Sequence, residues 1–301
     1  MRKTILIVSL LLLGLTLSAA FDAGHSDRLF YNEQAYQADY DYLIAALPEA
    51  AGAEEKADIL WRLSRTVLTL TDDIDKDNKD ARLSGYGKAQ DYAEKSLDAA
   101  ETPDGYLWLA SSIGRIGQVK GVLNSLKQAK PMRTYCEKAL NGFGAESSDT
   151  WYVLGVLYNQ LSVAGNLSFG DKNFAISYMR RCIETQDNVN RANLTNYLEL
   201  AEQLYDRGWD ASKKAKRIDK MKSSYNSETV LTEKMKYYEG YDGKNSRFVY
   251  DNNVISKLSD KQEAILVLKY ALETFEERED KLPADIEKAE KLKKKLAEYS
   301  K

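Results

Sequence analysis

Few side chains in this sequence have the types and spacing that catalysis requires. The only histidine, His25, has no recognisable partner that would orient it as a general base. A glycine-rich phosphate loop, a paired-cysteine motif and a His-Glu-x2-His motif are all missing from the sequence. We therefore expect a protein that is not an enzyme and uses no metal and no cofactor. His25 is expected in a disordered N-terminal tail.

One acidic segment resembles the start of a calcium-binding loop, with Asp73, Asp75, Asp77 and Asp80. A calcium site needs several oxygen ligands at about 2.3–2.6 Å. An EF-hand would continue with glycine at position 78 and glutamate at position 84, but these positions are Asn and Ser. The pattern favours a solvated loop between two helices.

The remaining candidates are a basic run and two cysteines. The run spreads over more than one face of a helix, which favours a solvated helix over an anion site (Lys213, Lys214, Lys216, Arg217, Lys220 and Lys222). Cys136 and Cys182 are 46 residues apart at equivalent positions of a repeat. This spacing is consistent with buried free thiols, and an exported protein could instead join them in a disulfide.

A recurring four-position pattern is more informative than any candidate for catalysis. Residues 151–158 read Trp-x2-Leu-Gly-x2-Tyr, the first-helix pattern of the tetratricopeptide (TPR) repeat. Related patterns begin at Leu60, Tyr106 and Tyr197, so the four motifs are spaced by 46, 45 and 46 residues. The spacing resembles a TPR array with a lengthened period. HEAT and armadillo repeats, of about 40–47 residues, compete on length alone.

The apolar spacing predicts an all-α, TPR-like solenoid of about four degenerate helix pairs with extra terminal helices. The expected domains are a signal peptide at 1–20, the repeat domain at 21–222, a linker at 223–258 and capping helices at 259–301. Within the repeat domain we expect one helix at 27–47, followed by pairs at 54–70 with 88–100 and at 106 onward with 131–140. The last two pairs are 149–163 with 171–184, and 194–206 with 210–221.

One stripe of each first helix is left over once the motif positions pack inward. In TPR arrays the neighbouring stripe lines a concave surface that binds ligands, which makes the matching positions here candidates for binding. Aromatic and arginine side chains dominate many protein interfaces, so the stripe is expected to bind a protein or peptide. The terminal helices could instead cover it. The candidate binding residues are Trp61, Arg65, Leu107, Ser111, Arg115, Tyr152, Asn159, Glu202 and Tyr205.

The N-terminus has the features of a secretory signal. Arg2 and Lys3 precede an apolar stretch that ends in Ser18-Ala19-Ala20, so cleavage is expected after Ala20. Without these two cations, 41 basic and 46 acidic residues remain, a mildly acidic balance that does not favour nucleic acid. We expect an extracytoplasmic protein, periplasmic or secreted, with no membrane insertion after cleavage.

Residues 58–65, Asp-Ile-Leu-Trp-Arg-Leu-Ser-Arg, resemble the Leu-Trp-Arg-Leu-Ala-Arg segment of regulator-of-microtubule-dynamics TPR proteins. Trp108, Gly121, residues 137–140 and the Leu154-Gly155 pair follow in that family's order, over about residues 35–220. The resemblance implies the fold. A cleaved export signal would separate the chain from the cytoskeleton, so the family's function is not expected to transfer.

A second resemblance is to the T component of TRAP transporters, in the long second unit and the Leu-Gly-x2-Tyr motif of the third. T components are exported TPR proteins that work beside a solute-binding protein, and they are typically lipoproteins. This sequence has no cysteine near the expected cleavage site. The expected function is therefore an exported, non-enzymatic scaffold that binds a protein or peptide. The alternative is a ligand-handling accessory of a small-molecule transporter.

Overall fold

The computed structural model describes residues 21–144, 146–163, 168–186, 192–242 and 254–301. These residues contain fourteen α-helices and no strand, which confirms the all-α prediction. The expected signal peptide, residues 1–20, lies outside the described residues. Among the residues described, no helix combines the length and the apolar composition needed to cross a membrane.

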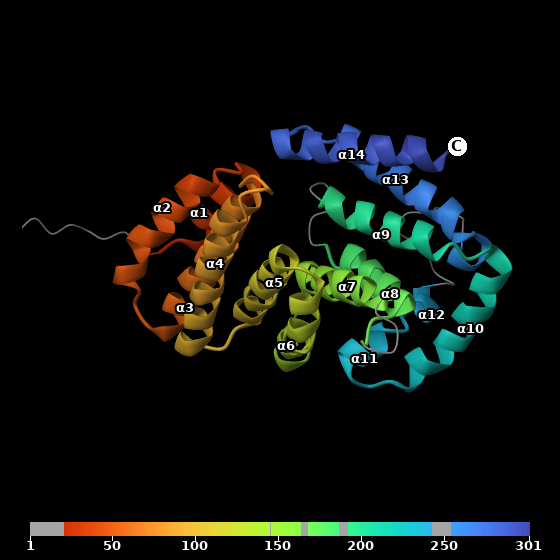
Figure 1. Ribbon diagram of the computed structural model, residues 1–301, viewed down its shortest axis with the longest axis horizontal. Coiled ribbons are helices and arrows are strands. Elements are labelled where there is room, and N and C mark those ends of the chain that lie inside the picture. Colours follow the sequence, from red (N-terminus) through yellow and green to blue (C-terminus); the bar gives the residue numbers. More distant parts are fainter. Residues whose placement is uncertain (1–20, 145, 164–167, 187–191, 243–253) are drawn as a thin grey trace, which may run out of the picture.

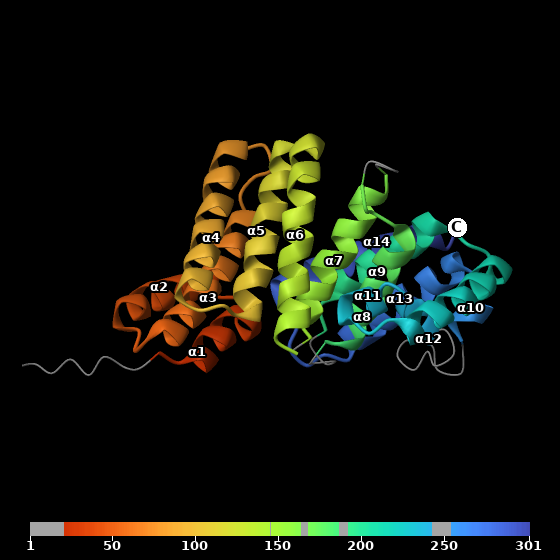
Figure 2. The same cartoon turned by 90° about the horizontal axis from the view of Figure 1, so that it is seen from below.

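Three consecutive helix pairs form the body of the molecule (Figures 1 and 2). They are α3 (Ala53–Asp72) with α4 (Lys79–Ala99), α5 (Pro103–Lys120) with α6 (Val122–Gly142), and α7 (Ser148–Ser162) with α8 (Lys172–Glu184). The first helix of each pair also contacts the first helix of the next, up to α9 (Leu194–Arg207). This is the helical-repeat arrangement that the motif spacing predicts.

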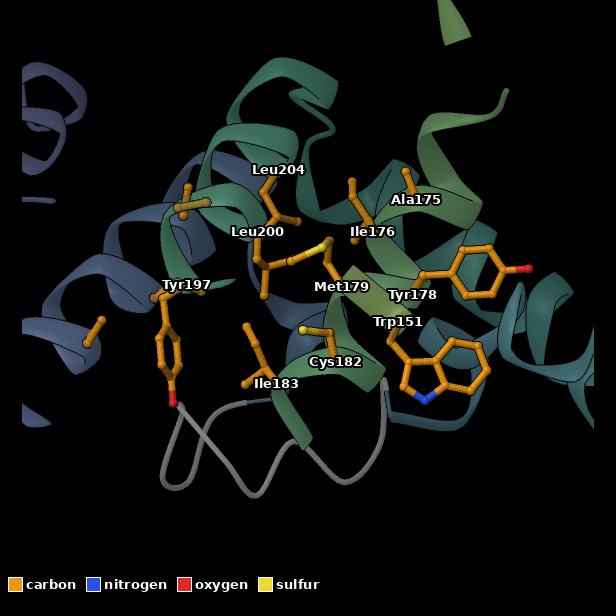
Figure 3. Close-up of a cluster of buried hydrophobic side chains, with 14 of the residues drawn as sticks. Trp151, Ala175, Ile176, Tyr178, Met179, Cys182, Ile183, Tyr197, Leu200 and Leu204 are labelled. Atoms are coloured by element: carbon orange, nitrogen blue, oxygen red, sulfur yellow. The ribbon is translucent and has the colours of Figure 1, made fainter. Parts of the chain in front are cut away.

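The motif positions are buried in all four first helices, as predicted. Trp151 is fully buried and stacks on Tyr178 of α8, with ring centroids 5.6 Å apart (Figure 3). Gly155 is required by packing, since an added Cβ would lie 2.6 Å from Sδ of Met179. Cys182 lies in the same core and Cys136 is equally buried, and both are free thiols. Burial raises the pKa of both, so they contribute to the structure as small apolar groups.

Long helices account for the lengthened period in the first two units. Helix α4 begins at Lys79, nine residues before the predicted start, because Asn78 accepts a hydrogen bond from the Ala81 amide as an N-cap. Helix α6 begins at Val122, so Pro131 lies inside it and does not open it. The predicted start at Pro131 was wrong, since the helix continues before Pro131 although proline cannot donate the backbone hydrogen bond of its turn.

The fourth unit has a different second helix from the predicted one. Helix α9 ends at Gly208, whose φ of 62° turns the chain away, and α10 (Ala211–Ser227) does not pair with it. Helix α13 (Asp260–Glu276) packs on α9 instead. The reason is the apolar area that each helix can bury. Helix α10 buries only two apolar side chains, Ile218 and Met221. Helix α13 buries a full apolar stripe, formed by Ala264, Val267, Leu268, Ala271 and Phe275.

The segment between these helices folds back onto the third unit. Helices α11 (Leu231–Met235) and α12 (Tyr238–Asp242) contact α8 and α10, and η5 (Ile255–Lys257) contacts α10. The last helix, α14 (Pro283–Tyr299), runs along α9 and α13 (Figure 1).

The N-terminus does not form the single helix predicted over 27–47. A short α1 (Ala23–Asp27) continues into the π-helical turn η1 (Arg28–Asn32). Gln34, with a φ of 52°, then breaks the chain before α2 (Tyr36–Ala46) and the short η2 (Leu47–Glu49). This interruption of the helix allows η1 to pack against apolar and charged side chains of α3.

Candidate protein-binding surface

The predicted stripe forms a continuous row across neighbouring helices, because α3, α5, α7 and α9 contact one another in that order. We call this set the binding row. It consists of Trp61 and Arg65 on α3, Leu107, Ser111 and Arg115 on α5, Tyr152 and Asn159 on α7, and Glu202 and Tyr205 on α9. Their role in binding stays a prediction.

The centre of the row is partly accessible to solvent. Ser111, Arg115, Tyr152 and Asn159 are half-buried, whereas Leu107 is buried with the core. The side chain of Arg115 is 39% exposed, and its Nη2 donates to Oδ2 of Asp72 over 2.9 Å. Burial raises the pKa of Tyr152, and the nearby charges of Glu199, Arg115 and Asp72 also act on it. The centre therefore combines an aromatic ring with a paired guanidinium and an amide.

The N-terminal end of the row is covered. Arg65 is fully buried, and its guanidinium carbon lies 3.9 Å from the centroid of the Phe30 ring in η1. Trp61 is nearly as buried and donates its Nε1 hydrogen to Oδ1 of Asp58 over 2.8 Å. A partner can reach Arg65 only if the N-terminal segment, residues 21–33, moves.

Helix α14 covers the other end. Lys295 Nζ lies 3.1 Å from Oε1 of Glu202, and the ring of Tyr299 stacks on that of Tyr205. Of the two arrangements that the sequence left open, a covered row therefore describes both ends and a partly open row describes the centre.

Several carboxylates near the row were missed by the sequence reasoning. Burial raises the pKa of Asp104 on α5 and of Glu199 on α9, and Glu199 accepts a hydrogen bond from Nε2 of Gln203 over 2.9 Å. Both lie outside the stripe that the repeat motif defines, so the motif alone could not select them. Asp104 could have been found from an acidic residue that recurs two positions before the motif in three first helices, with Asp58 and Asp149, but Glu199 does not occupy that position.

The strongest group of charges lies outside the row and is closed to solvent. We call it the C-terminal charge network, and it joins α8, α9, α10, α12 and α13 through three cations and three carboxylates (Arg180, Arg207, Lys214, Glu239, Asp260 and Glu263). Arg207 bridges two of the carboxylates, with Nη1 2.6 Å from Glu239 and Nε 2.8 Å from Asp260. Because each charge is buried against an opposite one, the network positions helices.

Two predictions about isolated polar residues need correction. Lys214 belongs to the C-terminal charge network, whereas the other cations of the basic run are exposed on α10. Some of these exposed cations line a surface depression of about 550 Å³. His25 does not lie in a disordered tail, since it forms part of α1 and packs edge-on against the Tyr42 ring at 4.7 Å. Within the described ranges, no group of histidine, cysteine and acidic side chains could hold a metal ion.

The paired helices and the row across their first members define a helical-repeat protein. A model of the family described as "Regulator of microtubule dynamics protein 1-3" matches residues 23–168, from α1 to just beyond α7. The match covers just under half of the 301 residues, so it is the N-terminal part of the chain that is similar to this family. No curated protein matches the chain. Neither the specific TPR assignment nor the T-component resemblance is supported by these comparisons.

The family match corrects the expected localisation. The N-terminal sequence predicted an extracytoplasmic protein, either periplasmic or secreted, but the matched family is described by the regulation of microtubule dynamics. Microtubules assemble inside the cell, so the predicted localisation is wrong. Export therefore gives no reason to separate this chain from the cytoskeleton.

Proposed function

We propose that this protein is a non-enzymatic helical-repeat scaffold that binds a protein partner at the centre of the binding row and acts in the regulation of microtubules. The family match supports the microtubule assignment, since it covers α3, α5 and α7, which contribute most of the row. The transfer of this role from the family to the chain is the proposal.

The observation that best supports binding is the state of the row's centre. Ser111, Arg115, Tyr152 and Asn159 are only half-buried, although the two ends of the same row are covered by the chain itself. Tyrosine and arginine are over-represented among the residues that contribute most binding energy. The neighbouring carboxylate Glu199, whose pKa burial raises, favours a partner with basic or hydrogen-bond-donating groups.

The test is the rate of growth and shortening of microtubules assembled from purified tubulin, with and without the full chain. The variant Arg115→Ala/Tyr152→Ala removes the two largest side chains at the row's centre. The matched control is Asp91→Ala/Lys95→Ala, which removes an exposed ion pair from the outer helix α4.

The proposal expects the wild-type chain to change at least one of these rates, the row variant to lose the effect and the control to keep it. Circular dichroism establishes that both variants are folded. An unchanged rate with the wild-type chain contradicts the microtubule assignment. An effect that persists in the row variant contradicts the site.

A further inference from the structure

The N-terminal segment, residues 21–33, lies on α3 at the covered end of the binding row. Ser26, Leu29 and Phe30 are buried there, and Asp27 lies between them in sequence. The segment is short and irregular, since it consists of five residues of α1 and the π-helical turn η1. Side-chain contacts hold it in place, both with α3 and with Asp39 and Tyr42 of α2, to which Ser26 donates over 2.6 Å and the Asp22 amide over 2.7 Å.

Two side chains of the segment make the principal contacts. The carboxylate of Asp27 forms ion pairs with the guanidinium groups of Arg62 and Arg65. Its Oδ2 lies 3.0 Å from Nη2 of Arg62, and its Oδ1 lies 2.9 Å from Nη1 of Arg65. Three residues later, the ring of Phe30 lies under the guanidinium of Arg65. A carboxylate and an aromatic ring in this spacing thus satisfy one pair of arginines by charge and by cation–π contact.

The arginines keep other partners when this carboxylate is absent. Asp58 pairs with Arg62 from the preceding turn of α3, and Oδ2 of the buried Asp39 lies 3.5 Å from Nη2 of Arg65. Thr66 Oγ1 donates to the same carboxylate over 2.5 Å. Since neither guanidinium would be left without a counter-charge, the segment can leave without stranding a buried cation.

The site also has a hydrogen-bond donor that the segment does not use. Nε of Arg65 is buried and has no hydrogen-bond acceptor among the described residues. A ligand that also offered an acceptor to this hydrogen would gain a contact that the segment does not make.

We propose that Arg62 and Arg65 form a binding site for an acidic–aromatic peptide, and that the N-terminal segment occupies this site as an autoinhibitory ligand. The peptide carries a carboxylate three residues before an aromatic ring, as Asp27 precedes Phe30. The inference rests on the proposed function, because it identifies the ligand of one end of the same row. A peptide from another molecule can bind only after the segment is displaced. Its apparent affinity is therefore the intrinsic affinity multiplied by the fraction of molecules in which the site is free.

The experiment uses a fluorescent peptide with the sequence of residues 21–35 and measures its anisotropy with the full chain. The full-chain variant Asp27→Asn/Phe30→Ala weakens the internal segment and leaves the site on α3 intact. The peptide is expected to bind this variant at least about tenfold more tightly than it binds the wild type. The single variant Asp27→Asn, which keeps the Phe30 ring, replaces the double variant if circular dichroism shows the double variant to be unfolded.

Two altered peptides test the chemistry of recognition. A peptide with Asp27→Asn and Phe30→Ala should lose binding, whereas Arg28→Ala should bind as the native peptide does, since Arg28 is exposed in the structure. Equal binding to wild type and variant, or no binding to either, overturns the inference.

The proposed function fails separately. If the peptide does not bind but the chain still changes the rates of microtubule growth or shortening, only the site on α3 is contradicted. Peptide binding without any effect on microtubules contradicts only the proposed function. The variant Arg115→Ala/Tyr152→Ala is expected to keep peptide binding, because Asp27 and Phe30 of the N-terminal segment contact Arg62 and Arg65 on α3.

Discussion

Tyr299 of α14 stacks on Tyr205 of α9, with ring centroids 3.6 Å apart and ring planes within 3° of parallel. The two residues are far apart in sequence and come from different helices, so the stack closes the end of the binding row with the last turn of the last helix. Lys295, one turn earlier, adds an ion pair with Glu202. The row's end is thus covered by an aromatic contact and a partly exposed charge pair.

Removal of the stack should loosen α14. The variant Tyr299→Ala is expected to lower the free energy of unfolding by about 2 kcal/mol, because a mostly buried aromatic ring and its stacking partner are lost. Urea unfolding measures the loss, and hydrogen exchange should show faster exchange in α14 than in α7. The exposed Lys293→Ala on the same helix should change neither quantity, and an equal effect of both variants would contradict the assignment.

The C-terminal charge network predicts a larger loss. In Glu239→Gln, Arg180 and Arg207 lose a shared buried anion, so unfolding should become easier by about 3 kcal/mol. The control is Glu233→Gln, a partly exposed carboxylate on the neighbouring α11 that pairs with Lys236. It should change the free energy of unfolding by less than about 0.5 kcal/mol. Similar values for the two variants would mean that the buried network contributes little.

The same carboxylate predicts a dependence of stability on pH. Burial by itself would raise the pKa of Glu239, but Arg207 and Arg180 lower it from 4.5 to about 2. Because the folded-state pKa is the lower one, this stabilisation is complete above pH 4.5 and is lost as the pH falls towards 2. The loss is on the order of 3 kcal/mol for this group. Urea unfolding at pH 5.5 and 2.5 should show a smaller difference in Glu239→Gln than in the wild type, and an identical difference would contradict this.

The repeat motif correctly predicted the features of the fold that depend on residues close together in sequence. Its apolar positions are buried in all four first helices, and Trp151 with Gly155 packs on α8 as the motif requires. These positions follow from helical periodicity, which a single segment contains in full. At α14 the local signal is Pro283, which lies in the first turn, where proline is favoured.

The sequence could not predict which distant segments would meet. The stripe of α13 is visible in sequence, but its choice of α9 as partner depends on the apolar area that α10 lacks. The cover on Arg65 depends on a positive φ at Gln34 that turns η1 onto α3. Both are tertiary choices between remote elements, and for that reason the accessible part of the row could not be separated from its covered ends.

Two glycines of α4 offer a matched test of how closely α3 and α4 approach. A Cβ on Gly85 would lie 2.2 Å from Oγ1 of Thr71, whereas a Cβ on Gly87 would have nothing within 4 Å. Thr71 is buried, and its hydroxyl donates to the Val67 carbonyl oxygen over 2.6 Å, so its side chain cannot move without breaking that bond. Gly85→Ala should therefore lower the free energy of unfolding by about 1–3 kcal/mol, as overpacking does.

Gly87→Ala should have the opposite sign. Both positions are helical, so alanine restricts the unfolded chain equally in the two variants and favours the helix by about 0.4–1 kcal/mol. At Gly87 nothing opposes this gain. Urea unfolding of the two variants therefore isolates the contact between the helices, because helix propensity contributes to both alike. If both substitutions stabilised the protein, α4 would have to be free to move away from Thr71, and the close approach of α3 and α4 would not limit the packing of the first unit.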